Sequence, residues 1–153
     1  MERQTTALLT RSTALSTEPT STSVVDGGAP ASYALAGLSS ITIQGSYDDD
    51  TLTVDSSGGV LDLPGGIHFD GGSGSDALQL VKTGGPTITA SAIDLGPSSG
   101  GGKSTITDDA NTQTVFFDNL EPNSGVVTVD YTTTGAAVQV VWVGIETVKT
   151  AKI

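Results

Sequence analysis

The chain has 153 residues, a formal net charge of −11 and no cysteine, and only 5% of its residues are aromatic. This acidity argues against nucleic acid and anionic membrane surfaces as partners, because both are bound through basic side chains. The lack of cysteine excludes disulfides, thiolate metal ligands and cysteine nucleophiles, and no apolar run approaches the roughly 20 residues that a membrane span needs.

Residues 1–28 are rich in Ser and Thr with only scattered apolar positions. Such a composition predicts a flexible tail, in which a short helix over 6–15 is one option. The tail has no continuous apolar region of the kind found in a secretory signal peptide. Export would therefore need another route, or this chain would be part of a longer one. Residues 29–153 are expected to form a single domain.

Beyond the tail, short apolar or alternating segments recur at intervals of about ten residues, each bounded by Gly, Pro, Asp or Ser. This pattern predicts an all-β domain, and no window shows the periodicity of an amphipathic helix. The expected strands are 41–45, 51–55, 60–64, 66–70, 77–81, 87–95, 104–108, 114–120, 126–131 and 137–148.

Internal similarity suggests how these strands are arranged. The stretch GSYDDDTLTV at 45–54 aligns with GGSGSDALQL at 71–80, which places Asp50 opposite Asp76. LGPSSG at 95–100 and LEPNSG at 120–125 share four of six letters. A period near 25 favours a β-solenoid, similar to a parallel β-helix, with about three short strands in each rung. A β-sandwich is the alternative fold, and a chain biased toward Gly, Ser and Thr can also imitate repeats by chance.

One motif points to a ligand. GGSGSDALQ at 71–79 matches the pattern G-G-x-G-x-D-x-U-x, where U is apolar. Glycines permit a tight turn in which backbone carbonyls point inward, and the aspartate adds an anionic oxygen. Calcium prefers six to eight oxygen ligands, so a second turn would have to lie beside the first.

The motif resembles the glycine-rich nonapeptide of the repeats-in-toxin, or hemolysin-type, calcium-binding proteins. The wider pattern over roughly 41–148 is similar to β-strand repeat proteins of bacterial cell surfaces. The resemblance implies that calcium lies between stacked turns, with Asp76 as a ligand and Gly71, Gly72 and Gly74 as turn glycines. Only one complete nonapeptide is present, the partner turn GSYDDD departs from the pattern, and the spacing is 26 residues where the family has 18.

Local charge agrees with a cation site. No Lys or Arg occurs between Arg11 and Lys82, although aspartates are frequent there, and a divalent cation relieves repulsion between carboxylates. The alternative is that each aspartate caps a turn through its own backbone. The full set of expected calcium-site residues is Asp48, Asp50, Asp70, Asp76, Gly71, Gly72 and Gly74.

An enzyme is not expected. GGGKST at 100–105 lacks the first glycine of a phosphate-binding loop. The single histidine, His68, has no nucleophile motif and is expected to face solvent from a strand. Trp142 lies in an apolar run that predicts a core position.

These patterns together favour an acidic structural or adhesive repeat domain, secreted or on a cell surface, stabilised by calcium and packed against neighbouring repeats or copies of itself. Three alternatives stay open. One is a carbohydrate- or receptor-binding β-domain, which would show exposed aromatics on one face. The second is a self-assembling filament or surface-layer subunit, and the third, least favoured, is a glycan-active enzyme with paired carboxylates.

Overall fold

The computed structural model describes residues 6–12, 20–25, 31–97, 100–120, 126–132 and 139–142, and the side chains discussed below lie within 33–97 and 100–120. This part of the chain is all-β, and it contains no helix that is long and apolar enough to cross a membrane. The expected fold class is thus confirmed at the level of an all-β protein.

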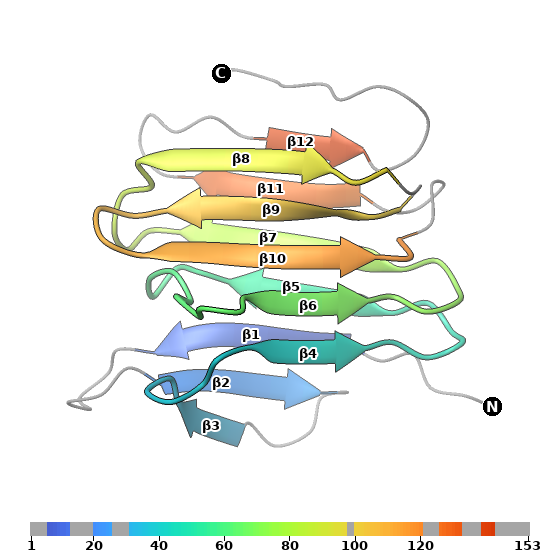
Figure 1. The fold of residues 1–153 in the computed structure, drawn as a ribbon, viewed down its shortest axis with the longest axis horizontal. Helices are drawn as coiled ribbons and strands as arrows, with labels where there is room; N and C mark the ends of the chain where they lie inside the picture. The colour runs from blue at the N-terminus through green and yellow to red at the C-terminus, as the bar shows by residue number, and fades with distance from the viewer. Residues whose placement is uncertain are drawn as a thin grey trace.

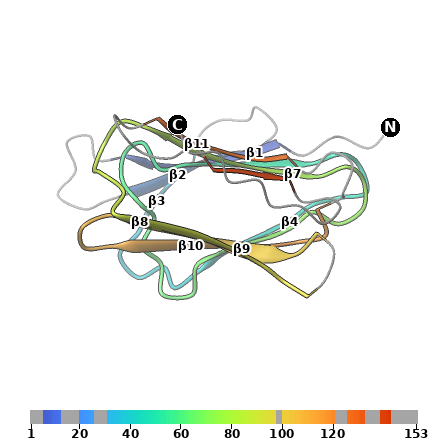
Figure 2. The same cartoon turned by 90° about the horizontal axis from the view of Figure 1, so that it is seen from above.

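Two mixed sheets face each other as two layers (Figure 2). Sheet A has the order β12-β11-β7-β5-β1-β2-β3, and sheet B has the order β4-β6-β10-β9-β8. The strands of sheet A are β1 (Thr6–Ser12), β2 (Thr20–Val25), β3 (Ala31–Ala34), β5 (Thr51–Asp55), β7 (Ala77–Thr83), β11 (Val126–Thr132) and β12 (Gln139–Trp142). Those of sheet B are β4 (Ile41–Gln44), β6 (Ile67–Asp70), β8 (Ala90–Leu95), β9 (Gly102–Thr107) and β10 (Thr112–Asp118).

The chain alternates between the two sheets from β4 to β7, as Figure 1 shows. β4 pairs with β6 in parallel in sheet B, and β5 pairs with β7 in parallel in sheet A. Both ladders join residues 26 apart, such as Thr53 and Gln79, whose side chains are also hydrogen-bonded. The expected alignment of 45–54 with 71–80 therefore corresponds to real strand pairing.

The core fills the space between the layers with aliphatic residues that alternate with outward-facing ones. In sheet A, Leu52 and Val54 stack on Leu78 and Leu80, in the burial pattern of a strand with one covered face. Ile67, Phe69, Val115 and Phe117 face them from sheet B. Parallel pairing places each apolar residue of β5 beside an apolar residue of β7, so the core can be filled although it contains few aromatic residues.

The expected strand at 60–64 is wrong. Val60, Leu61 and Leu63 are buried, as their apolar character requires, but they lie in an irregular segment between β5 and β6. The Leu61 amide donates to Oε1 of Gln113, 2.9 Å away, and therefore bonds to a side chain of β10. The 26-residue interval from the start of β4 to the start of β6 thus contains two strands where three were expected.

The repeat expected between 95–100 and 120–125 does not produce parallel stacking within the described residues. β8 pairs antiparallel with β9, and β9 pairs antiparallel with β10. Parallel pairing resumes only where β10 meets β6 and β11 meets β7. The two strands β8 and β9 are therefore an antiparallel addition to sheet B, and residues 121–125 and 143–153 lie outside the described part.

The N-terminal segment contributes strands where a tail was expected. β1 occupies Thr6–Ser12, so the optional short helix over 6–15 is wrong. β1 pairs with β5 in parallel and with β2 antiparallel. The domain boundary after residue 28 and the flexibility of 1–28 stay predictions. The core position expected for the Trp142 side chain lies outside the described side chains.

Candidate functional site

The structure brings together the residues predicted from the glycine-rich motif. The turn from β4 to β5 (45–50) and the turn from β6 to β7 (71–76) stack directly on one another, and we call them the turn pair. Asp50 and Asp76 are buried at equivalent positions at the end of each turn. Asp48 is half-buried in the first turn, and Asp70 precedes the second.

We call β4 and β5 with the turn between them one level, and β6 and β7 with their turn the next. Hydrogen bonds join these two levels at the turn pair. The Asp50 amide donates to Oδ1 of Asp76 at 2.7 Å, and the Ser75 amide donates to Oδ1 of Asp49 at 2.8 Å. Between backbones, the Ser73 amide donates to the Ser46 carbonyl at 3.2 Å. Within the first turn, the carboxylate of Asp50 accepts from the Ser46 amide. The aspartates thus accept hydrogen bonds both within a level and between levels.

Glycines allow the two backbones to approach so closely. Gly72 and Gly74 have φ values of +94° and +133°, where a side chain is strained. A Cβ on Gly72 would lie 2.5 Å from the Ser46 carbonyl oxygen, and one on Gly74 would lie 2.5 Å from that of Asp48. Gly71 is equally confined, because its Cβ would lie 2.5 Å from Oδ2 of Asp76. Gly72 and Gly74 are therefore needed for packing of backbone against backbone, and Gly71 leaves room for the Asp76 side chain.

Carboxylate side chains alone do not complete a calcium site at the turn pair. Within the described residues, no group of three or more Asp, Glu or His side chains is arranged to hold a metal ion. Two carboxylate oxygens of the turn pair, Oδ2 of Asp48 and Oδ2 of Asp76, accept no hydrogen bond in the structure, and two are far from the six to eight oxygens that calcium takes. Oδ1 of Asp70 is already occupied, because it accepts from the Gly72 amide and from Asn119. Calcium binding stays a prediction.

A second cluster of buried polar groups lies where β7 ends. Lys82 is fully buried, and its ammonium donates to the Gly84 carbonyl. Burial lowers the pKa of Lys82, while the charges of Asp108 and Asp55 act in the opposite direction. Asp108 is buried in the turn between β9 and β10. Burial alone would raise the pKa of Asp108, but hydrogen bonds from the backbone of Ala110, from the backbone and side chain of Asn111 and from the backbone of Val60 hold it below its usual range.

The outer face of sheet B carries a row of side chains across all five strands. The register aligns Thr42, His68, Phe116, Lys103 and Asp94, one from each of β4, β6, β10, β9 and β8. The rings of His68 and Phe116 are stacked, with centroids 4.6 Å apart and planes inclined by 13°. At the far end of the row, Nζ of Lys103 lies 3.5 Å from a carboxylate oxygen of Asp94.

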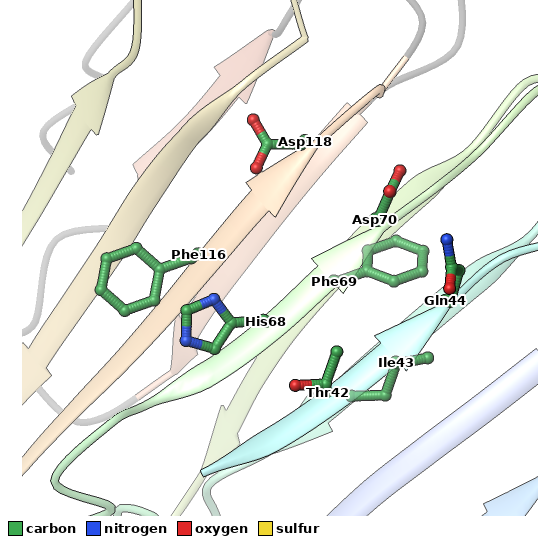
Figure 3. Close-up of a pocket in the computed structure, with 8 residues that line it drawn as sticks. All are labelled: Thr42, Ile43, Gln44, His68, Phe69, Asp70, Phe116 and Asp118. Carbon is green, nitrogen blue, oxygen red and sulfur yellow. The ribbon is translucent and has the colours of Figure 1, made fainter.

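A second row on the same face consists of Gln44, Asp70 and Asp118, which lie next to each other in the register. The two rows border a hollow of about 160 Å³, and Figure 3 shows the side chains around it. His68 is exposed, as expected from the sequence. Its Nε2 lies 2.8 Å from the Gly65 carbonyl oxygen and donates to it, which fixes the orientation of the ring.

Sequence reasoning did not find this hollow. Phe116 and Asp118 follow the alternation of β10, in which Val115 and Phe117 are buried and their neighbours point outward. That alternation is a usable signal, but the alignment of Phe116 with His68 depends on a pairing between strands far apart in sequence. Tyr33 and Tyr47 are exposed aromatic side chains of the described residues, but neither borders the hollow. Comparison of the chain with protein-family models, with curated proteins and with solved structures finds no match.

Proposed function

We propose that this chain is a structural repeat domain, built as a β-solenoid of two-strand rungs and used as part of a secreted or cell-surface protein. The observation that carries the proposal is the 26-residue register between β4-β5 and β6-β7. The same strands and turn recur at successive levels. A further level, from the same chain or from another copy, could therefore pair with the last one in the same way.

Side chains that bond between levels support this proposal. Besides the turn pair, Oγ of Ser57 lies 2.9 Å from Oγ1 of Thr83, and the Thr83 amide donates to Ser57. These bonds join residues 26 apart, as does the bond between Thr53 and Gln79, and all of them use polar side chains. Ser, Thr, Asp and Gly, which are frequent in the sequence, thus form the contacts between the two levels.

The acidic composition supports a location outside the cell. High negative charge keeps an extended repetitive surface soluble and discourages association with anionic polymers and membranes. The resemblance to hemolysin-type and surface-repeat proteins agrees with that location. Strand edges at β4 and β8 leave neighbouring repeats, or copies of the chain, as the partners proposed for this domain.

We further propose that the turn pair is held by its own hydrogen bonds and close backbone packing, and that a cation is not required. A thermal melt followed by circular dichroism, in millimolar calcium and then in excess chelator, tests this directly. The same Tm in both conditions supports turns that are complete without metal. A rise of several degrees with calcium, absent with magnesium and lost in Asp76→Ala, would show that the calcium-stabilised version implied by the resemblance is correct.

The proposed location has its own test. Intact cells of the source organism are treated with a protease and then probed with an antibody raised against residues 29–153. Loss of the signal from intact cells is the expected result. A signal that is protease-resistant in intact cells and lost only after lysis would contradict a surface location, whatever the melt shows.

A further inference from the structure

The outer face of sheet B combines features that suit a sugar ring. The hollow of about 160 Å³ is close to the size of a cavity that holds one six-membered carbon ring. The stacked rings of His68 and Phe116 form one side of it, and Figure 3 shows them next to each other. Aromatic rings that are bordered by a few placed polar groups are typical of small-ligand sites.

The polar groups around the rings include both hydrogen-bond donors and acceptors. Thr42 offers a hydroxyl, Gln44 offers an amide, and Asp70 and Asp118 offer carboxylate oxygens. Asp118 is exposed at the end of β10, whereas Asp70 is anchored by bonds to Gly72 and Asn119. A ligand rich in hydroxyl groups can satisfy such a mixed set, because each hydroxyl both donates and accepts.

A second hollow adjoins the first on the other side of Phe116. It has a volume of about 350 Å³ and is bordered by Asp94, Lys103, Phe116 and Asp118. Phe116 and Asp118 belong to both hollows. A ligand with linked rings could therefore lie across Phe116, with one unit on each side. Lys103 is paired with Asp94, and the carboxylates of Asp70, Asp94 and Asp118 outnumber its single ammonium, so the two hollows disfavour an anionic sugar.

We propose that this face binds a neutral oligosaccharide of at least two sugar units, which lies across Phe116 with one ring against His68 and Phe116. The proposal goes beyond the structural role, and a domain that binds no sugar could still serve that role. Binding to a small open hollow is expected to be weak, with a Kd on the order of 1 mM.

The test is a nuclear magnetic resonance titration of the 15N-labelled chain with four neutral tetrasaccharides, namely cellotetraose, laminaritetraose, maltotetraose and mannotetraose. At least one of them is expected to give saturable shifts centred on Thr42, His68, Phe116 and Asp118. Phe116→Ala is expected to weaken that binding at least tenfold. His68→Ala changes an exposed residue and should weaken binding also, which keeps the test valid if Phe116→Ala does not fold.

The matched control is Thr105→Ala, which changes β9 on the same face outside both hollows and is expected to leave affinity unchanged. Hexalysine serves as the cationic probe, at about 0.02 M and about 0.5 M salt, because salt screens charge-driven binding. Sugar binding that is unaffected by salt supports the proposal. It is overturned if none of the four sugars shifts these residues, if Phe116→Ala and His68→Ala bind as the parent chain does, or if only hexalysine binds and salt abolishes that binding.

Discussion

Segments 41–83 and 90–118 use aspartate in turns in two different ways. In the first segment, Asp76 accepts a hydrogen bond from Asp50, which is 26 residues away at the level below. In the second segment, Asp108 accepts from Ala110 and Asn111, two and three residues along the chain. The bond between Asp50 and Asp76 forms only when two levels stack in register. The bonds from Ala110 and Asn111 to Asp108 form within one hairpin, to which the Val60 backbone adds one from outside.

The two segments differ in how far their structure depends on pairing with residues distant in the sequence. The β9-β10 hairpin is defined locally, because its turn and its antiparallel ladder involve adjacent residues. The parallel pairs β4-β6 and β5-β7 are not local, and each requires a complete level below it. Changes at the turn pair should therefore disturb the stacking of levels, and equivalent changes in the hairpin should have smaller and more local effects.

The largest effect is expected from a side chain placed between the levels. Gly72→Ala should destabilise the fold by about 3 kcal/mol or more, because strain at φ +94° adds to a clash with the Ser46 carbonyl. Gly84→Ala is the matched control. Gly84 has a φ of +90° but open space at its Cβ, so only the strain of about 1–2 kcal/mol is expected. Urea denaturation measures both, and equal costs would mean that close stacking contributes nothing.

The next effect concerns the acceptor that joins the levels. Asp76→Ala removes the oxygen that receives the buried Asp50 amide and should cost about 1–3 kcal/mol. Asp76→Asn keeps an oxygen at that place and should cost less. Asp62→Ala, at an exposed position, should stay within about 0.5 kcal/mol. Chemical denaturation ranks the three variants, and an Asp76→Ala value no larger than that of Asp62→Ala would refute a role in stacking.

The hairpin aspartate is tested by pH. The folded state lowers the pKa of Asp108, so the ionised group contributes stability above the unfolded pKa, which is about 3.8. That contribution is lost as the pH falls through the lower folded value. Asp108→Asn, which cannot ionise, should therefore lose less stability between about pH 5 and pH 2 than the parent chain. Tm measured across this range gives the comparison, and parallel curves would contradict the lowered pKa.

The smallest effect is expected at the exposed ion pair of sheet B. The side chains of Lys103 and Asp94 are 46% and 70% exposed, so solvent screens their attraction. Asp94→Ala should change the free energy of unfolding by less than about 0.5 kcal/mol. Denaturation at low and high salt provides the measurement. A larger loss, abolished by salt, would show that the outer face contributes more to stability than its exposure suggests.

Much of the fold was accessible from alternation and turn residues. The strands near 41–45, 51–55 and 77–81 were expected almost at their observed bounds, because apolar residues occupy every second position between clusters of Gly and Asp. The aligned turns predicted the contact between Asp50 and Asp76. The strand predicted at 60–64 does not form, because apolar spacing indicates burial and does not show whether backbone groups pair with a neighbouring strand.

The candidate sites were less predictable. The turn glycines were expected to allow close approach, but the sequence does not show that Gly72 and Gly74 face backbone carbonyls of the other turn, whereas Gly71 faces the Asp76 side chain and the Asn119 carbonyl. The hollow beside Phe116 depends on the pairing of β10 with β6, across the chain segment that contains β7, β8 and β9. No local pattern in the sequence encodes that pairing, so the row from Thr42 to Asp94 was not accessible.

The measurement that tests the stacking of levels most directly is a disulfide across β5 and β7. The chain has no cysteine, so two introduced cysteines report only on each other. Thr53 and Gln79 are paired in the register and face outward, which suits disulfide geometry. Thr53→Cys with Gln79→Cys should form a disulfide rapidly under mild oxidation. Thr53→Cys with Val81→Cys, two residues out of register, should form it slowly or not at all; the opposite order of rates would contradict the 26-residue register.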